Sequence, residues 1–172
     1  PLTSDNIYSE IQKDLLLPIY ISSSMANDTF LRDWVIKGEQ NIDEIQKYLL
    51  EIKIKYQAVS SFFVSDLTKK YYYSDGLLKT VKKTEPRDKW FYRVKNIKRL
   101  YEINVDLDMA NSDIITIFIN YKVFDFSGRF IGATGVGLPV KTMKSRIDHY
   151  QNIYHRNIFF TNASGTAILA DK

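Results

Sequence analysis

The segment Glu85-Pro86-Arg87-Asp88-Lys89-Trp90-Phe91-Tyr92 gathers charged and aromatic side chains of the kinds that enclose a small polar molecule. Flat aromatic rings cover such a molecule, and a tyrosine hydroxyl or an indole N–H offers a hydrogen bond at a fixed place. Charged neighbours bind a group of opposite charge. Arg87, Asp88, Trp90 and Tyr92 are therefore candidate ligand-binding residues, although the aromatic residues could equally anchor this segment to the core.

Three further candidate ligand-binding residues belong to predicted strands. Tyr73 ends a run of three tyrosines, Asn104 lies in the predicted strand Tyr101–Val105, and Asp106 follows the end of that strand. Asp106 also opens the oxygen-rich stretch to Asp113, whose spacing a calcium ion would accept. The central glycine and distal glutamate of an EF-hand loop are missing there, so turn chemistry is favoured and no metal or cofactor is expected.

The composition narrows the chemistry further. The 172 residues contain no cysteine and two histidines, which excludes thiolate nucleophiles, disulfides and cysteine-based zinc sites and leaves no His-rich metal cluster. Gly132, Gly135 and Gly137 lie within an apolar strand, where close backbone packing explains them better than a phosphate loop. Because no Gly-x-Ser-x-Gly motif is present either, we expect that this chain is not an enzyme.

The stretch Lys79–Arg99 is basic, with nine Lys or Arg residues and two acidic ones, and the chain carries a net charge of +4. Basic residues mixed with aromatic ones could bind a nucleic-acid backbone and stack its bases, which keeps a nucleic-acid-binding module as an alternative. No nucleic-acid fold signature accompanies the stretch. A solvated helical face is the favoured interpretation, and no nucleic-acid partner is expected.

The spacing of the apolar residues predicts the helices and strands that could position the candidate ligand-binding residues. Apolar or small residues recur about every four positions from Ile7 to Phe30, which predicts an amphipathic helix that Pro18 kinks and Gly38 ends. A second helix is predicted from Asn41, followed by Glu44 as in a capping box.

Short runs rich in Val, Ile, Phe and Tyr then predict about five strands. The predicted strands are Ala58–Ser65, Lys70–Ser74, Tyr101–Val105, Ile114–Phe126 and Phe130–Leu138. Leu77–Leu100 is expected to form a mostly irregular or helical connection that covers the sheet, and Asp106–Asp113 a polar loop. This order predicts an α+β fold with a PAS-like antiparallel sheet and a long N-terminal helix.

Beyond the sheet, Val140–Tyr154 has helical spacing, and Ile158–Thr161 with Thr166–Leu169 flank a turn-forming stretch. We expect an N-terminal helical segment (1–56), a sheet module (57–139), and a connecting helix with a hairpin (140–172) that begins a second module or completes the first.

Two motifs resemble those of Cache domains, also called PDC domains. These motifs are the Arg87-Asp88-Lys89-Trp90-Phe91 segment and the strands from Ile119 to Gly132, which lead into a Gly-Val-Gly-Leu close. Cache domains are extracytoplasmic sensors of bacterial chemoreceptors, histidine kinases and diguanylate cyclases. The resemblance covers about Ala58 to Leu138 and implies a PAS-like sheet, with the ligand between the sheet and the long connection.

The resemblance also bears on the ligand. In amino-acid-binding relatives, an Arg-x-Trp-Tyr unit holds a carboxylate, and acidic residues of later strands hold an ammonium group. Trp90 matches that unit and Asp106 the first acid, but Asp88 stands in the arginine position, next to Arg87, and Gly137 in place of the second acid. We therefore expect a small carboxylate or another compact polar metabolite rather than an ordinary α-amino acid.

The resemblance further implies a periplasmic location, as the extracytoplasmic part of an inner-membrane signalling protein whose membrane anchor lies outside this sequence. No apolar run within the chain approaches the length of a membrane span. Similar domains pair through the N-terminal helix, so a homodimer is expected. A structural spacer without a ligand is the remaining alternative to a sensor.

Overall fold

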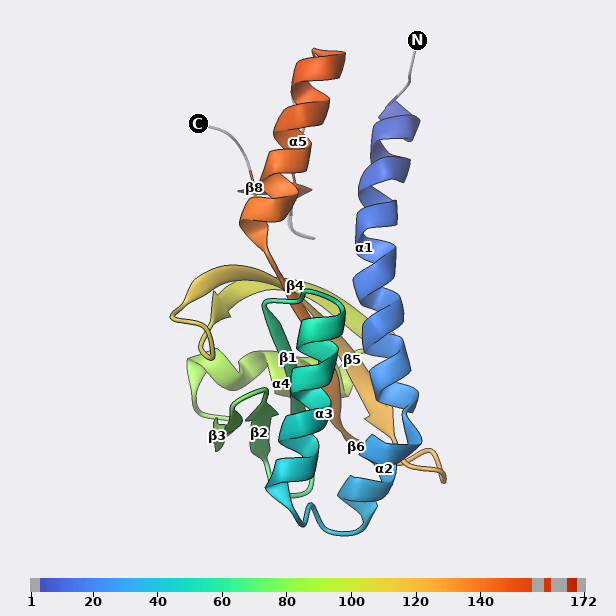
Figure 1. The fold of residues 1–172 in the computed structure, drawn as a ribbon, viewed down its shortest axis with the longest axis vertical. Coiled ribbons are helices and arrows are strands. Elements are labelled where there is room, and N and C mark those ends of the chain that lie inside the picture. The colour runs from blue at the N-terminus through green and yellow to red at the C-terminus, as the bar shows by residue number, and fades with distance from the viewer. Residues whose placement is uncertain (1–3, 156–159, 162–166, 170–172) are drawn as a thin grey trace.

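The computed structural model describes residues 4–155, 160–161 and 167–169, and an antiparallel sheet of six strands lies at its centre (Figure 1). The strand order is β3-β2-β1-β6-β5-β4. The strands are β1 (Ser60–Ser65), β2 (Lys70–Tyr73), β3 (Gly76–Thr80), β4 (Tyr101–Asp108), β5 (Ile114–Phe124) and β6 (Phe130–Pro139). The predicted α+β class and the antiparallel sheet are confirmed, with one strand more than expected.

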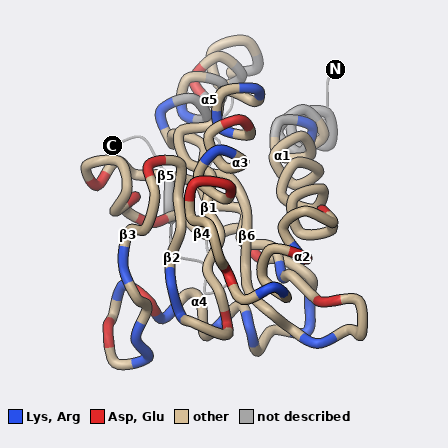
Figure 2. The backbone as a smooth tube through the Cα atoms, turned by 60° about the horizontal axis from the view of Figure 1, so that its bottom comes forward, with Lys and Arg blue, Asp and Glu red and all other residues tan. Residues whose placement is uncertain are grey.

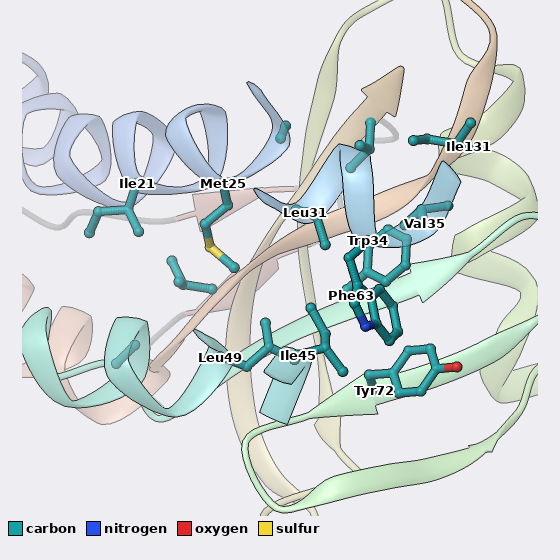
Figure 3. Close-up of a cluster of buried hydrophobic side chains, with 14 residues drawn as sticks. Ile21, Met25, Leu31, Trp34, Val35, Ile45, Leu49, Phe63, Tyr72 and Ile131 are labelled. Carbon is teal, nitrogen blue, oxygen red and sulfur yellow. The ribbon is translucent and has the colours of Figure 1, made fainter. Parts of the chain in front are cut away.

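Three helices precede the sheet and cover one of its faces: α1 (Ser4–Asn27), α2 (Thr29–Ile36) and α3 (Ile42–Lys55). Figure 3 shows their apolar side chains pointing toward Phe63 of β1 and Tyr72 of β2. The helical residues of this cluster include Ile21, Met25, Leu31, Trp34, Val35, Ile45 and Leu49. The amphipathic periodicity of the N-terminal segment therefore reflects burial against the sheet.

The first helical segment ends earlier than predicted. It breaks at Asp28 rather than running to Gly38, because the Asp28 side chain accepts a hydrogen bond from the backbone N–H of Phe30 at 2.8 Å and caps α2. Pro18 lies inside α1, which continues past it. The new start lets α2 turn Trp34 into the core, where its indole N–H donates to the carbonyl oxygen of Gln40.

Two boundaries of the sheet also differ from the prediction. Residues Leu77–Thr80, expected within an irregular or helical connection, belong to the edge strand β3 (Gly76–Thr80), which is paired with β2 alone. β4 runs through to Asp108, where a polar loop was expected from Asp106 onward, and pairs with β5 up to Ile114. Polar and apolar residues alternate along the end of β4, which is the pattern of a strand with one polar side. The polar residues of this pattern are also typical of a loop, so the prediction placed the loop too early.

A short helical layer covers the other face of the sheet, as predicted. It consists of a 3₁₀ turn (Pro86–Asp88) and α4 (Lys89–Asn96). Trp90, Phe91 and Val94 of α4 are buried against Phe62 and neighbouring residues of the sheet. Residues 86–96 thus lie opposite the α1–α3 layer.

The chain leaves the sheet at Pro139 and enters α5 (Val140–Tyr154), the predicted connecting helix. α1 and α5 both extend beyond the same end of the sheet (Figure 1). Of the predicted C-terminal hairpin, β7 (Phe160–Thr161) and β8 (Ala167–Leu169) form an antiparallel pair, whereas Ile158 and Thr166 lie outside the described residues. Among the helices described, none combines the length and the apolar character needed to cross a membrane.

Candidate ligand-binding site

A partly open pocket lies on the α4 face of the sheet, and its space together with the solvent at its mouth amounts to about 360 Å³. Residues of β1, β2, β4 and β5 meet there with residues of the 3₁₀ turn, α4 and the β4–β5 turn. Its lining consists of Phe62, Tyr71, Arg87, Trp90, Asn104, Asp106, Leu107, Met109, Phe118 and Asn120.

Aromatic rings in edge-to-face contact form the walls of the pocket. The ring of Phe62 lies 5.6 Å from that of Trp90 and 6.0 Å from that of Phe118, measured between centroids, and both pairs are nearly perpendicular. The rings of Tyr71 and Trp90 are 6.1 Å apart in a similar arrangement. Each of these rings packs against another, so the walls form one aromatic cluster.

Polar groups enter the pocket from two sides. Asn104 and Asp106 come from β4 and Asn120 from β5, while Arg87 reaches the pocket from the 3₁₀ turn. Asp106 is exposed, and its carboxylate accepts a hydrogen bond from the backbone N–H of Leu107 at 2.8 Å. The pocket therefore joins an apolar box to a few fixed donors and acceptors, the arrangement of small-molecule sites in general.

No protein-family model matches the sequence. The fold, in contrast, matches solved sensory domains. For the sensory domain of the Campylobacter jejuni chemoreceptor Tlp3 with isoleucine bound, the TM-score is 0.63 at 16% identity, covering 95% of this chain and 64% of that one. For the sensor domain of the Vibrio cholerae histidine kinase DctB, the TM-score is 0.60 at 14% identity, covering 82% and 55%. For the Escherichia coli DcuS sensor domain it is 0.58 at 10% identity, covering 81% and 98%.

This chain has a Cache fold. The resemblance drawn from Trp90 and its neighbours is thereby confirmed at the level of the fold. The chain spans about 64% of the length of the chemoreceptor sensory domains that it matches.

Four of the seven candidate residues come together in the pocket of this Cache fold: Arg87, Trp90, Asn104 and Asp106. The other three do not line it. Asp88 is buried, pairs with the Lys79 ammonium group at 2.6 Å and accepts a hydrogen bond from the backbone N–H of Lys82.

Tyr92 and Tyr73 are both half-buried. The hydroxyl of Tyr92 lies 3.5 Å from the carbonyl oxygen of Val81, and Tyr73 pairs with Phe62 at the end of β2. For Asp88, Tyr92 and Tyr73, a direct contact with ligand stays a prediction. The structure gives Asp88 a separate part, in joining the 3₁₀ turn to Lys79 and Lys82.

Six lining residues were not foreseen as such: Phe62, Tyr71, Leu107, Met109, Phe118 and Asn120. A signal for most of them exists in the sequence, because alternate residues of a strand face the same side. Asn104 and Phe118 are register partners, as are Tyr71 and Val64. Such partners cannot be assigned before the register of the strands is known.

Gly137, which stands where the resemblance places a second acid, lies against the side chains of β5. A Cβ atom at this position would approach Cγ2 of Thr116 to 2.7 Å and Cε1 of Phe118 to 3.1 Å. A side chain here would force these neighbours to move. The acidic groups around the pocket come instead from the 3₁₀ turn and from β4.

The pKa of the Tyr71 hydroxyl reflects the negatively charged side chains near the pocket wall. Its pKa is raised above the usual range, first by burial and then by the negative charges of Asp108, Asp88 and Asp106. Three carboxylates therefore act on one point of the pocket wall.

The basic segment Lys79–Arg99 does not present Trp90 or Phe91 to solvent, as the nucleic-acid alternative requires. Trp90 and Phe91 are 8% and 0% exposed, so neither ring is free to stack on a base. Ion pairs engage four basic residues of this segment: Lys79 with Asp88, Arg87 with Asp113, Arg93 with Glu102, and Lys95 with Asp66. In Figure 2, basic and acidic stretches are interspersed along the backbone.

The oxygen-rich stretch after Asp106 forms a turn. Asp108 accepts hydrogen bonds from the backbone N–H of Ala110 and from the side-chain amide of Asn111, and Asp113 pairs with Arg87. Within the described residues, no group of three His, Cys, Asp or Glu side chains is placed to hold a metal ion.

Proposed function

We propose that this chain is the extracytoplasmic ligand-sensing part of a bacterial membrane-anchored signalling protein, and that its pocket binds a small solute. The observation that carries this proposal is the meeting of Arg87, Trp90, Asn104 and Asp106 in one aromatic-walled pocket of a Cache fold. Two solved neighbours are described with amino acids bound: Tlp3 with isoleucine and Mlp24 with asparagine. A small carboxylate or another compact polar metabolite is the ligand class proposed, and the domain itself carries no catalysis.

We further propose the division into a helical segment (1–56), a sensor module (57–139), and a connecting helix with a hairpin (140–172). The exit of the chain from the sheet at Pro139 and the separate β7–β8 pair support this division. Leu16, Leu17 and Tyr20 of α1 are 44%, 59% and 64% exposed, which supports pairing of two copies through this helix.

The two tryptophans of the chain provide a matched test, because Trp34 lies in the helical layer and Trp90 lines the pocket. Trp34→Phe leaves Trp90 as the only tryptophan. A panel of small carboxylates, amino acids and amines is then screened for a shift of the unfolding temperature and of Trp90 fluorescence. A compound at 100 times its Kd should stabilise the chain by about 2.7 kcal/mol.

Trp90→Phe should abolish or greatly reduce that stabilisation, whereas Trp34→Phe should retain it in full. Trp34→Phe also loses the hydrogen bond to Gln40, so its lower starting stability serves as a control for effects on the fold. If no compound of the panel stabilises the chain or alters Trp90 fluorescence, the sensor proposal fails and the structural spacer replaces it.

A further inference from the structure

The side-chain amide of Asn120 lies between the pocket and a carboxylate. On the pocket face of the sheet, Glu102 of β4 is the register partner of Asn120 of β5, as Asn104 is of Phe118. Asn120 lines the pocket and is 2% exposed. Register partners of an antiparallel pair face the same side of the sheet, so the side chain of Glu102 stands directly beside the amide.

The carboxylate of Glu102 is itself held by Arg93 of α4. The guanidinium group donates from Nε to Oε2 at 2.8 Å and from Nη2 to Oε1 at 2.7 Å. Such a two-point pair fixes the plane of the carboxylate as well as its position. The side chain of Glu102 is 16% exposed, so solvent screens the pair less than it would a pair of fully exposed groups. Glu102 therefore presents a fixed negative oxygen to Asn120.

This fixed oxygen determines which way the Asn120 amide points. An asparagine side chain carries a donor, the Nδ2 group, and an acceptor, the Oδ1 atom, and a half-turn of the amide exchanges their places. Nδ2 of Asn120 donates to Oε1 of Glu102 at 3.4 Å. In the opposite orientation Oδ1 would face a carboxylate oxygen, and the two acceptors would repel each other. Oδ1 is thus turned away from Glu102, and no hydrogen bond to it is formed within the described part of the chain.

We propose that Arg93 and Glu102 are positioning residues that hold the Asn120 amide with Oδ1 toward the pocket. Asn120 is then a specificity-determining residue, which selects a ligand group that donates an N–H or O–H hydrogen bond. This inference rests on the proposed function and narrows its ligand: a carboxamide or hydroxyl group meets Asn120, and a ligand carboxylate is disfavoured there. A ligand that leaves Oδ1 unpaired loses affinity, because a buried acceptor without a partner keeps its desolvation cost.

Three propionyl compounds test this selection. Propionamide carries an N–H donor, propionate has nearly the same shape but only acceptors, and N,N-dimethylpropionamide lacks the donor without carrying a charge. Each is titrated into the whole isotope-labelled chain, and NMR follows the side-chain amide of Asn120 and the indole N–H of Trp90. Propionamide should bind about tenfold or more tightly than the other two. If either of these binds as tightly as propionamide, the inference fails and the sensor function stands.

Reversal of the ion pair gives the sharpest contrast. The double variant Arg93→Glu with Glu102→Arg keeps the net charge and the pairing of α4 with β4, but position 102 then offers donors instead of acceptors. The Asn120 amide should turn Oδ1 toward position 102 and Nδ2 toward the pocket. Propionate should therefore bind more tightly than propionamide. An order of affinities that stays as in the wild type contradicts the inference.

Lys95→Gln is the matched control for the attachment of α4. Lys95 pairs with Asp66, the side chains are 40% and 19% exposed, and neither residue lines the pocket. This variant should leave the Asn120 amide signals and the order of affinities unchanged. Glu102→Leu should shift those signals and reduce the advantage of propionamide severalfold, and the unfolding temperature of each variant verifies its fold. Equal effects of the two variants would show that a loosened α4, rather than the amide, sets the preference.

The order of affinities in the wild type decides the inference even if the double variant does not fold. Binding of none of the three compounds also overturns it. The sensor function is then judged separately, by the wider panel of compounds and the Trp90 and Trp34 variants.

Discussion

Phe62 and Phe63 are neighbours on β1, and Tyr71 and Tyr72 are neighbours on β2, yet the two members of each pair face opposite sides of the sheet. Phe63 and Tyr72 pack under the helices with Trp34, while Phe62 and Tyr71 line the pocket. The same residue types therefore fill a core on one face and enclose an opening on the other.

The two tyrosine hydroxyls show this difference most directly. The Tyr72 hydroxyl donates to the carboxylate of Glu39 at 2.8 Å, and the same carboxylate accepts hydrogen bonds from Thr68 and Ser65. Tyr71 instead lines the pocket, and burial, followed by the negative charges of Asp108, Asp88 and Asp106, raises the pKa of its hydroxyl. The Tyr72 hydroxyl thus has its partner within the protein, whereas Tyr71 lies in the wall of the pocket.

Alanine at each phenylalanine should give the largest effect. Phe63→Ala should lower the free energy of unfolding by about 3–5 kcal/mol, because a fully buried ring leaves a closed cavity. Phe62→Ala should cost about 1 kcal/mol less, since its cavity joins the pocket and water can enter it. Urea denaturation measures both values. An equal cost, or the reverse order, would contradict the distinction between a closed face and an open one.

Phenylalanine at each tyrosine should give a smaller effect with the same asymmetry. Tyr72→Phe should lower the free energy of unfolding by about 1.5–3 kcal/mol, because its hydroxyl donates to a buried charged group. Tyr71→Phe should change it by about 0.5 kcal/mol or less while altering ligand affinity. Denaturation without ligand and titration with ligand separate the two effects, and a large stability loss in Tyr71→Phe would count against the comparison.

Acid should act on both faces alike through Asp125, in the β5–β6 turn. The hydroxyl of Ser127, the backbone N–H groups of Arg129 and Ser127, and the Arg129 charge lower the pKa of Asp125 from 3.8 to about 2. Because the folded-state pKa is depressed, the stabilisation is fully present above roughly pH 4 and is lost as the pH falls toward about 2.

Comparing the wild type with Asp125→Asn across this range should show a stability difference at neutral pH that shrinks as the pH falls. Phe62→Ala and Phe63→Ala should lose the same increment on acidification. A difference between them would mean that acid acts on one face rather than on the shared turn.

The sequence predicts the layers of this fold well, because each depends on a local period. The stripe of α1, the core strands and the aromatic face of α4 follow from apolar spacing alone. The end of β4 was missed because Asn104, Asp106 and Asp108 form the polar side of a strand, and a polar side next to a pocket looks like a loop in the sequence. The break at Asp28 was missed because the apolar stripe continues across it.

The sequence predicts those residues of the candidate site that lie within one segment of the chain. It does not predict contacts between residues of different strands. Trp90 and Arg87 lie within one motif, and Asn104 and Asp106 within another. The meeting of Tyr71 with Asn104 and Asp106 in one pocket depends on the register of the five strands from β2 to β4 in the sheet, which no local pattern encodes. The pairing of Arg87 with Asp113 likewise spans 26 residues.

One buried hydroxyl of α1 is bonded directly to the backbone of the sheet. Ser22 is fully buried, and its Oγ accepts a hydrogen bond from the backbone N–H of Val136 in β6 at 3.3 Å. Sliding α1 by one turn, about 5.4 Å, would bring Ala26 or Pro18 to this place. Neither residue has a side-chain acceptor, so the N–H of Val136 would be left buried without its partner, at a cost of about 1–3 kcal/mol. This hydrogen bond therefore opposes slippage of α1 along β6.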